Sequence, residues 1–240
     1  MKKVLVIIPA YNEEKNIKNT VNKLLKLKFN NKYKLDYIVI NDGSQDSTLE
    51  VCKKNKIKVI TLINNLGIGG AVQTGYKYAY YNNYDIAIQF DGDGQHDENY
   101  IINLIQEIEN GYNMVIGSRF VERLSKFRSS SSRQLGIKIL SIFIKIFGQI
   151  KIYDPTSGFR AVDKKGIELF AFNYPIEYPE PSSSVDLIKS GLIIKEIPVE
   201  MRARQFGKSS INLVKSIYYM ISVCMAIVVA GLKKRGKLHE

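Results

Sequence analysis

Tryptophan is absent from the 240-residue chain, and cysteine occurs only twice, as Cys52 and Cys224. Because these two cysteines lie far apart in apolar stretches, we expect neither a disulfide framework nor a zinc site, which is typical of a protein from a reducing compartment. The apolar run after the two N-terminal lysines is too short for a secretory signal, and Val4–Ile8 is typical of a strand. These absences predict a cytoplasmic protein.

Acidic residues are outnumbered by basic ones. The chain has 35 Lys and Arg against 23 Asp and Glu, a net charge of +12 at pH 7. This excess predicts an anionic partner, which is nucleic acid, acidic phospholipid or a phosphorylated substrate. A nucleic-acid-binding module is disfavoured, because the aromatic residues are not arranged as stacking platforms and the basic residues cluster beside membrane-like segments. We therefore expect no nucleic acid partner.

The spacing of apolar residues predicts an α/β fold. Short β-branched runs alternate with helix-length amphipathic segments along the first half of the chain. The strand-like runs are Val4–Ile8, Tyr37–Ile40, Val59–Ile63, Ile86–Phe90 and Met114–Ile116. The helix-like segments are Asn16–Leu27, Ser47–Asn55, Gly70–Asn82 and Asn99–Asn110. This order predicts a Rossmann-like, mostly parallel sheet with helices on both faces, within one domain of residues 1–210.

Polar residues follow the predicted strands, where ligands bind in open parallel sheets. Tyr11 offers a flat ring for stacking, and Asp42 is placed to accept hydrogen bonds from a base or ribose. A nucleoside fits this pair. The alternative is an ordinary turn in which Ser44 or Asp46 caps the following helix.

Asp91 and Asp93 flank Gly92 directly after the fourth predicted strand. On an extended strand end both carboxylates face one side, and the glycine leaves room for a ligand. Mg²⁺ or Mn²⁺ suits this pair, since such a cation takes one or two protein carboxylates and completes its shell with water and substrate phosphates. An acidic turn without a metal is the alternative.

Several motifs, in their order and spacing, resemble family-2 glycosyltransferases, particularly the branch that transfers sugars to dolichyl and polyprenyl phosphates. They are Ile8–Glu13, Asn41–Thr48, Asn65–Gly70, Asp91–His96 and Asp154–Arg160. The resemblance implies a GT-A fold and an inverting, metal-dependent transfer from a nucleoside-diphosphate sugar. It also implies a nucleotide-sugar-binding half at residues 1–119 and an acceptor half at residues 120–210.

The same resemblance implies roles for individual residues. The nucleotide-sugar is expected to contact Pro9, Tyr11, Glu13, Asp42, Gly69 and Gln95, and the metal and diphosphate are expected at Asp91 and Asp93. Arg202 or Arg204 would bind the diphosphate through charge-assisted hydrogen bonds, unless this stretch is a solvated basic loop. His96 is either a metal or sugar contact or a hydrogen-bonded loop residue.

The acceptor is a lipid phosphate or a glycan hydroxyl. A phosphate is already anionic near neutral pH and needs no general base, whereas a hydroxyl does. Glu180 and Asp154 are the candidate bases, although Glu180 is also explained as a carboxylate at a helix start with Pro181 at the first helical position. Ser157 and Arg160 are expected to contact the acceptor, or else to form an ordinary turn.

The remaining segments predict contact with an anionic membrane surface. Residues 119–133, with five basic residues and five serines, are expected to form a loop, followed by a helix at Gln134–Gln149. Ser216–Leu232 lacks charge but spans only about 26 Å as a helix, short of a ~30 Å hydrocarbon core. The first half of the predicted helix at Ile211–Leu232 carries the polar residues Asn212, Lys215, Tyr219 and Ser222 at helical spacing. Together with Lys233, Lys234, Arg235 and Lys237 after it, they favour an interfacial helix in residues 211–240. We expect peripheral or monotopic attachment at the inner face of the plasma membrane. Packing on the domain or pairing in a homo-oligomer is the alternative.

Overall fold

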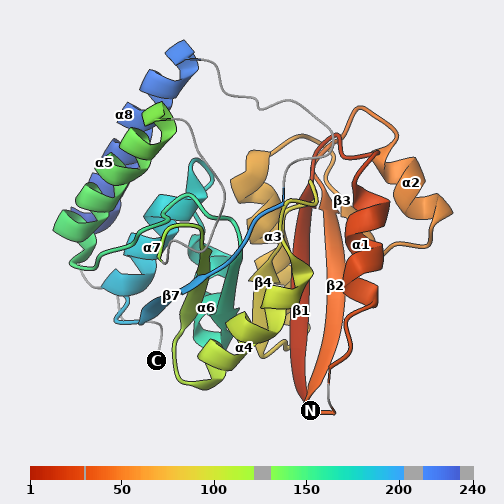
Figure 1. Ribbon diagram of the computed structural model, residues 1–240. Coiled ribbons are helices and arrows are strands. Elements are labelled where there is room, and N and C mark those ends of the chain that lie inside the picture. Colours follow the sequence, from red (N-terminus) through yellow and green to blue (C-terminus); the bar gives the residue numbers. More distant parts are fainter. Residues whose placement is uncertain (30, 122–130, 203–212, 233–240) are drawn as a thin grey trace.

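The computed structural model describes residues 1–29, 31–121, 131–202 and 213–232, without the side chains of residues 131–133 and 213–219 (Figure 1). The described residues form a seven-stranded sheet in the order β3-β2-β1-β4-β6-β5-β7. Its strands are β1 (Lys2–Ala10), β2 (Tyr33–Asn41), β3 (Val59–Thr61), β4 (Ile86–Gln89), β5 (Met114–Ser118), β6 (Arg160–Asp163) and β7 (Ile194–Pro198). The α/β class and the five predicted strands are confirmed, while β6 and β7 had no sequence prediction.

All neighbouring strands pair in parallel except at β6. This strand is antiparallel to β4 on one side and to β5 on the other, with Gln89 opposite Arg160 and Ile116 also opposite Arg160. Because β6 is antiparallel to β4 and β5, the loop that precedes it lies at the carboxyl ends of these two strands. The loop that contains Asp154–Phe159 is thereby brought to the edge where ligands bind in parallel sheets.

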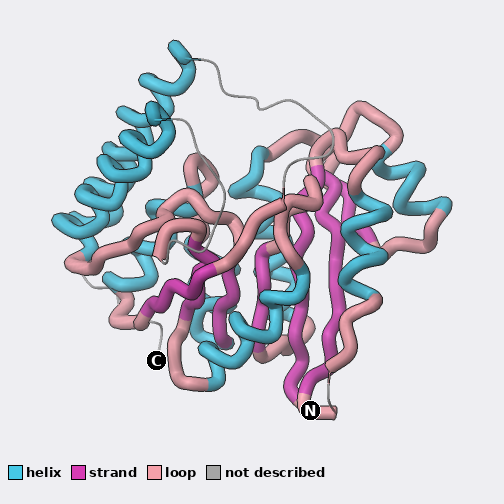
Figure 2. Tube along the Cα trace, in the orientation of Figure 1, coloured by secondary structure: helices cyan, strands magenta, loops and turns pink. Residues whose placement is uncertain are grey.

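Helices cover both faces of the sheet, as the alternation of strand side chains requires (Figures 1 and 2). On one face, Val4, Val6 and Ile8 of β1 pack with α1 (Ile17–Leu25), α2 (Thr48–Lys54) and α4 (Ile101–Glu109). On the other, Leu5 and Ile7 belong to a core shared by five helices. These are α3 (Gly67–Tyr81), α5 (Ser131–Gly148), α6 (Lys164–Asn173), α7 (Pro179–Lys189) and α8 (Leu213–Leu232).

The helices α5 and α8 form an outer pair that packs on α7. The first begins at Ser131, three residues before the predicted start, and residues 122–130 of the predicted loop lie outside the described residues. Within the parts of the chain that the structure describes, no helix is long and apolar enough to cross a membrane.

Candidate active site at the carboxyl edge of the sheet

The loops after β1 and β2 are joined by hydrogen bonds. Asn12 adopts the left-handed conformation (φ 57°), its N–H donates to Ser44 Oγ at 3.0 Å, and its Oδ1 accepts from the Gln45 N–H at 2.8 Å. The Glu13 N–H donates to Thr48 Oγ1 at 2.8 Å. This network fixes the backbone that carries Tyr11, whose side chain is 44% exposed at the surface. Pro9, at the end of β1, is buried.

The carboxylate of Asp42 anchors the start of α3. Its Oδ1 accepts a hydrogen bond from the Leu66 N–H at 2.8 Å. Burial raises the pKa of Asp42, and the backbone N–H groups of Leu66 and Gly67 oppose that rise. In the same loop Asp46, rather than Ser44, accepts from the N–H of Thr48 in the first turn of α2. The N-cap of α2 is Ser47, which makes no side-chain capping hydrogen bond, so neither Ser44 nor Asp46 is the cap residue. Asp42 directly follows the last residue of β2.

Gly69 is a glycine for a packing reason. A Cβ atom at this position would lie 2.1 Å from the carbonyl oxygen of Ile176, so the first turn of α3 rests directly on the backbone of the segment before α7. Gly69 is buried at this contact, so a side chain there would displace the segment before α7.

The Asp91–Gly92–Asp93 turn packs against the loop after β1. A Cβ on Gly92 would lie 3.0 Å from the Pro9 carbonyl oxygen and 3.7 Å from Glu13 Cγ. The hydroxyl of Thr20 donates to the Gly92 carbonyl at 3.1 Å. Asp93 is buried, and its Oδ1 accepts from the Gln95 N–H at 3.0 Å. The predicted nucleotide loop and the predicted metal motif are thus in contact.

His96 orients Asp91. Its Nε2 lies 3.0 Å from Asp91 Oδ2, and its ring stacks on Phe159 with centroids 4.9 Å apart. The side chain is only 2% exposed. His96 is therefore a hydrogen-bonded loop residue, the second of the two interpretations above.

The donor set suits a cation that is shared with a substrate. Nowhere in the described residues do three or more His, Cys, Asp or Glu side chains group so that they could hold a metal. Asp91 and Asp93 therefore offer two carboxylates and not a complete set of protein ligands. Such a pair fits Mg²⁺ or Mn²⁺ that takes its remaining ligands from diphosphate oxygens and water.

Glu180 lies at the same edge, on the other side of Asp91. It belongs to the first turn of α7, which starts at Pro179, two residues before the predicted first position, after Tyr178 in a left-handed conformation (φ 50°). The buried Gln89 hydrogen bonds to the Glu180 carboxylate, and its Nε2 also lies 3.5 Å from Asp91 Oδ1. Burial raises the pKa of Glu180; the charge of Arg160 lowers it, and that of Asp91 raises it further.

Arg160 and Ser157, the predicted acceptor contacts, hold loops together. The Arg160 side chain is 1% exposed and donates to three main-chain carbonyls, those of Glu180 at 2.5 Å, Ser157 at 2.6 Å and Pro155 at 3.0 Å. The Ser157 hydroxyl donates to the Gly117 carbonyl at 2.6 Å. Both side chains connect the loop before β6 to its neighbours.

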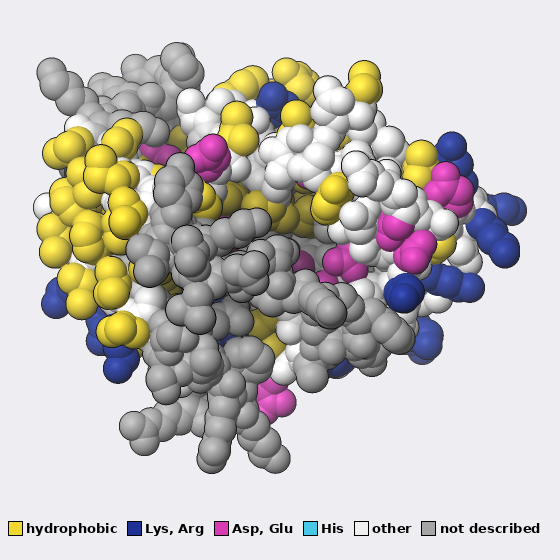
Figure 3. All heavy atoms as spheres, turned by 90° about the horizontal axis from the view of Figure 1, so that it is seen from above, with side chains coloured by type: hydrophobic (Ala, Val, Ile, Leu, Met, Phe, Trp, Pro, Cys, Tyr) yellow, Lys and Arg dark blue, Asp and Glu magenta, His cyan; other side chains and the backbone are white. Residues whose placement is uncertain are grey.

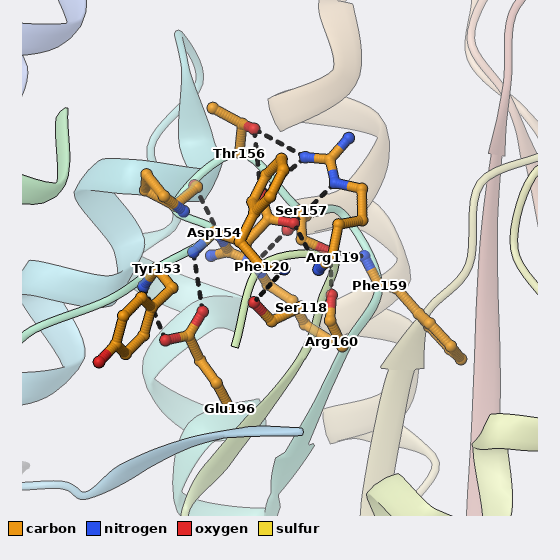
Figure 4. A network of polar contacts seen from close by, with 12 residues as sticks. Ser118, Arg119, Phe120, Tyr153, Asp154, Thr156, Ser157, Phe159, Arg160 and Glu196 are labelled. Carbon is orange, nitrogen blue, oxygen red and sulfur yellow. Dashed lines mark hydrogen bonds and ion pairs between the residues drawn. The ribbon is translucent and has the colours of Figure 1, made fainter. Parts of the chain in front are cut away.

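Asp154 forms a buried ion pair with Arg119 (Figure 4). Arg119 Nε and Nη2 donate to the two carboxylate oxygens at 2.7 and 2.6 Å, and the Arg119 N–H donates to Oδ2 at 3.0 Å. Glu196 accepts from the main-chain N–H groups of Tyr153 and Asp154. The sequence did not predict Arg119 as a site residue. It nevertheless directly follows the strand β5, just as Asp42 and Asp91 follow the ends of other strands.

Arg202 is paired with acidic residues near Gln95. Its Nη1 donates to Glu98 Oε2 at 2.7 Å, its Nη2 lies 3.0 Å from Asp97 Oδ1, and its N–H donates to the Gln95 carbonyl at 2.8 Å. Arg202 is thereby held beside the Asp91–Asp93 turn. Arg204, the alternative candidate, lies outside the described residues, as do residues 233–240 with the four basic residues of the C-terminal tail.

Comparison with known proteins agrees with this geometry. The family described as glycosyl transferase family 2 matches residues 5–170. The UDP-N-acetylglucosamine–dolichyl-phosphate N-acetylglucosaminyltransferase of Methanococcus voltae is 34% identical over 220 residues, which cover 83% of this chain and 85% of the relative. The polyprenol monophosphomannose synthase of Mycolicibacterium smegmatis is 24% identical over 88% of this chain and 81% of that one. The chain belongs to glycosyltransferase family 2 and is a glycosyltransferase.

A solved structure shows the same fold. Glucosyl-3-phosphoglycerate synthase from Mycobacterium tuberculosis, in complex with Mn²⁺, UDP-glucose and phosphoglyceric acid, matches with a TM-score of 0.68 at 17% identity. The match covers 96% of this chain and 80% of the synthase. The GT-A fold expected from the sequence is therefore confirmed.

Proposed function

We propose that the chain transfers a sugar, with inversion, from a nucleoside-diphosphate sugar to a lipid-linked phosphate acceptor. The observation that carries the proposal is the position of Asp91. Its turn packs against the loop of Pro9 and Glu13 on one side, and Gly158 and the Gln89–Glu180 pair adjoin its carboxylate on the other. A donor bound by the first loop would have its diphosphate at Asp91 and its sugar toward the acceptor half.

Donor binding is assigned to the β1 and β2 loops. Tyr11 provides an exposed ring for the base, and Asp42 a strand-end carboxylate for the base or ribose. Pro9, Glu13 and the main chain of Gly69 shape the same loop cluster. Gln95, hydrogen bonded through its main chain to Arg202, is assigned to the donor sugar.

The leaving group is a nucleoside diphosphate, on which negative charge develops as the glycosidic bond breaks. Asp91 and Asp93 would hold Mg²⁺ or Mn²⁺, which supplies charge stabilisation to that diphosphate when bound. His96 holds the Asp91 carboxylate through its Nε2, so that the carboxylate is oriented before a ligand arrives. Arg202 and Arg204 are proposed to add positive charge at the diphosphate.

The acceptor half is proposed to work without a base when the acceptor is a phosphate. Asp154 neutralises and orients Arg119, and the Arg119–Asp154 pair, Ser157 and Arg160 hold the loop that faces Asp91. In this assignment Asp154 positions the site and does not take a proton. Membrane-bound lipid phosphate is favoured as the acceptor by the two relatives named for dolichyl-phosphate and polyprenol substrates.

A glycan hydroxyl acceptor is the second candidate, and Glu180 is the observation in its favour. A carboxylate at the site whose pKa is raised by burial is suited to accept a proton near neutral pH. In that case Glu180 would be the general base.

The test is a transfer assay with UDP-, GDP- and dTDP-sugars, each with Mg²⁺ or Mn²⁺, and with polyprenyl phosphate or the corresponding polyprenol as acceptor. Transfer to the phosphate alone supports the first proposal. Transfer to a hydroxyl acceptor that is lost in Glu180→Gln supports the second. Absence of binding and turnover with every donor would exclude both.

A further inference from the structure

A glutamine is buried at the carboxyl end of β4. Side chains alternate between the two faces of a strand, so Gln89 lies on the same face as Ala87, toward the core shared with α3, α6 and α7. Ile86 and Ile88 belong to the core on the opposite face. The Gln89 side chain is 0% exposed. Since a buried amide costs free energy unless it is hydrogen bonded, its partners account for the presence of glutamine on this apolar face.

The amide nitrogen of Gln89 faces two carboxylates. Its Nε2 lies 3.5 Å from Asp91 Oδ1, and the same side chain hydrogen bonds to the Glu180 carboxylate. An amide nitrogen carries two N–H donors, which is one for each carboxylate. Asp91 follows β4, whereas Glu180 belongs to α7, so the amide connects two separate parts of the site. Figure 3 views this edge of the sheet from above and shows acidic side chains near the middle of the face.

The hydroxyl of Tyr174 fixes the orientation of this amide. Tyr174 directly follows α6, and its Oη donates to Gln89 Oε1 at 3.3 Å. Burial raises the pKa of the Tyr174 hydroxyl well above its ordinary value of 10, so the hydroxyl keeps its proton and remains a donor. The ring packs on those of Tyr76 and Phe170, with centroids 5.4 and 5.1 Å away. A reversed amide would turn its oxygen toward two carboxylates, which offer it no proton when ionised.

Both carboxylate oxygens of Asp91 have a neighbour that orients them. His96 Nε2 lies 3.0 Å from Oδ2, and Gln89 Nε2 lies beside Oδ1. Each carboxylate oxygen carries two lone pairs, so each retains one for a cation. The charges of Asp91 and Glu180 act on each other. Without the amide, repulsion between these like charges would favour rotation of Asp91 away from its present position.

We propose that Gln89, oriented by the Tyr174 hydroxyl, is a positioning residue that holds the Asp91 carboxylate in place for a divalent cation and connects it to Glu180. This inference rests on the proposed function, which assigns Asp91 to the cation. It adds a buried relay of hydrogen bonds that runs from the end of α6 through β4 to Asp91. The affinity for the cation should therefore depend on two buried side chains that are not themselves cation ligands.

Binding of Mn²⁺ to the full chain in the presence of UDP, GDP or dTDP, followed by electron paramagnetic resonance, tests the relay without relying on turnover. Gln89→Met nearly keeps the side-chain volume but removes the amide. It should weaken Mn²⁺ binding by about tenfold or more, the usual effect of losing a hydrogen-bond partner of a metal ligand. Tyr174→Phe keeps the ring and removes only the hydroxyl, so it should weaken binding by about threefold, as expected for one hydrogen bond.

A double variant and two matched controls show whether Tyr174 acts through Gln89. If it does, Tyr174→Phe should weaken Mn²⁺ binding no further in a chain that already carries Gln89→Met. Gln73→Met removes an amide that donates to the Ala171 carbonyl at 3.4 Å, and Tyr84→Phe removes a hydroxyl that donates to Asp36 Oδ2 at 3.1 Å. Both controls should bind Mn²⁺ as wild type does. Circular dichroism and thermal unfolding would show that each variant is folded.

The outcomes separate this inference from the proposed function. Mn²⁺ affinity that is unchanged in Gln89→Met and Tyr174→Phe, while wild type binds the ion, would overturn the relay and leave the proposed function intact. Additive losses in the double variant would exclude a relay through Gln89. If Gln89→Met does not fold, unchanged affinity in Tyr174→Phe alone overturns the proposal. Wild-type protein that binds no Mn²⁺ with any of the three nucleotides would remove the metal assignment, and the relay with it.

Discussion

Gly158 packs directly against the carboxylate of Asp91. A Cβ at position 158 would lie 2.9 Å from Asp91 Oδ2 and 2.9 Å from Gln89 Nε2, too close for either to stay in place. The loop before the reversed strand β6 thus determines where the strand-end carboxylate sits.

Gly158→Ala is expected to displace Asp91 and to lower kcat by about tenfold or more, since misplaced catalytic groups lose that much. The concentration of Mg²⁺ or Mn²⁺ needed for half-maximal activity should rise. Gly148→Ala is the matched control, because its Cβ would meet only ordinary contacts at 3.5 Å. Steady-state kinetics with a metal titration measures both effects. Equal kinetics for the two variants would contradict the role of Gly158.

Asp93→Asn is expected to remove most transfer activity, about 100-fold in kcat, while the fold remains intact. If Asp93 holds a divalent cation as proposed, a neutral amide would not balance the charge of that cation. Asp42→Ala should act differently, mainly by raising the KM for the donor. Asp85→Asn, at the opposite end of β4, controls for the loss of a carboxylate. A wild-type rate for Asp93→Asn at saturating metal would exclude the metal-ligand role.

The pH dependence of stability should report the buried state of Glu180. Its pKa is raised in the folded protein above an ordinary value of 4.5, so the folded state keeps the proton to higher pH than the unfolded chain. The stability contributed by the protonated form is complete below the ordinary pKa and is lost as the pH rises through the raised value.

Glu180→Gln is neutral at every pH and escapes this loss. Its free energy of unfolding relative to wild type should therefore increase as the pH rises above the ordinary pKa of 4.5 toward the raised value. Urea unfolding at a series of pH values measures the difference. A difference that is constant with pH would show that Glu180 has the same pKa in both states.

The Arg119–Asp154 pair is expected to be a structural requirement of the loop before β6. Asp154→Ala removes the carboxylate from the buried Arg119 cation, which keeps the Thr156 hydroxyl as a partner, and should cost about 3–5 kcal/mol of unfolding free energy. Replacing both partners, as in Arg119→Met with Asp154→Leu, should cost less than Asp154→Ala alone. Glu109→Ala breaks exposed pairs with Lys2 and Lys32 and should cost about 0–1 kcal/mol. Equal losses for Asp154→Ala and Glu109→Ala would contradict the burial argument.

Local periodicity was sufficient to predict the first half of the fold. The runs around Val4–Ile8 and Ile86–Phe90 are apolar on both faces, as buried parallel strands must be, and the structure confirms them. The strand β6 was not predicted because only two of its four residues, Ala161 and Val162, are apolar, and its last residue, Asp163, caps α6. Strand direction is also a tertiary property, and nothing local marks β6 as reversed.

The same distinction between what a local sequence pattern predicts and what only the tertiary structure determines applies to the site. Asp91, Asp93 and Asp42 were found because each follows a strand, and parallel strands bring their ends together. The Arg119–Asp154 pair joins residues that are 35 positions apart in the chain. The hydrogen bond from Arg160 to the Glu180 carbonyl joins residues that are 20 positions apart. Side-chain geometry at that separation depends on the packed fold, so a residue pattern alone predicted Asp154 and Arg160 as site residues but not what they touch.

The position of β6 bears on how the protein is made. Its two neighbours in the sheet, β4 and β5, both precede it in the chain, whereas the neighbours of β5 are β6 and β7. During synthesis, residues 114–118 can have no place in the sheet until residues 160–163 have left the ribosome. A nascent chain that ends near Arg119 would hold β4 with an open edge and β5 with no partner at all, which is a template for aggregation. Residues 114–118 therefore cannot join the sheet before residues 160–163 have been made, so we expect the two parts of the sheet to be completed together.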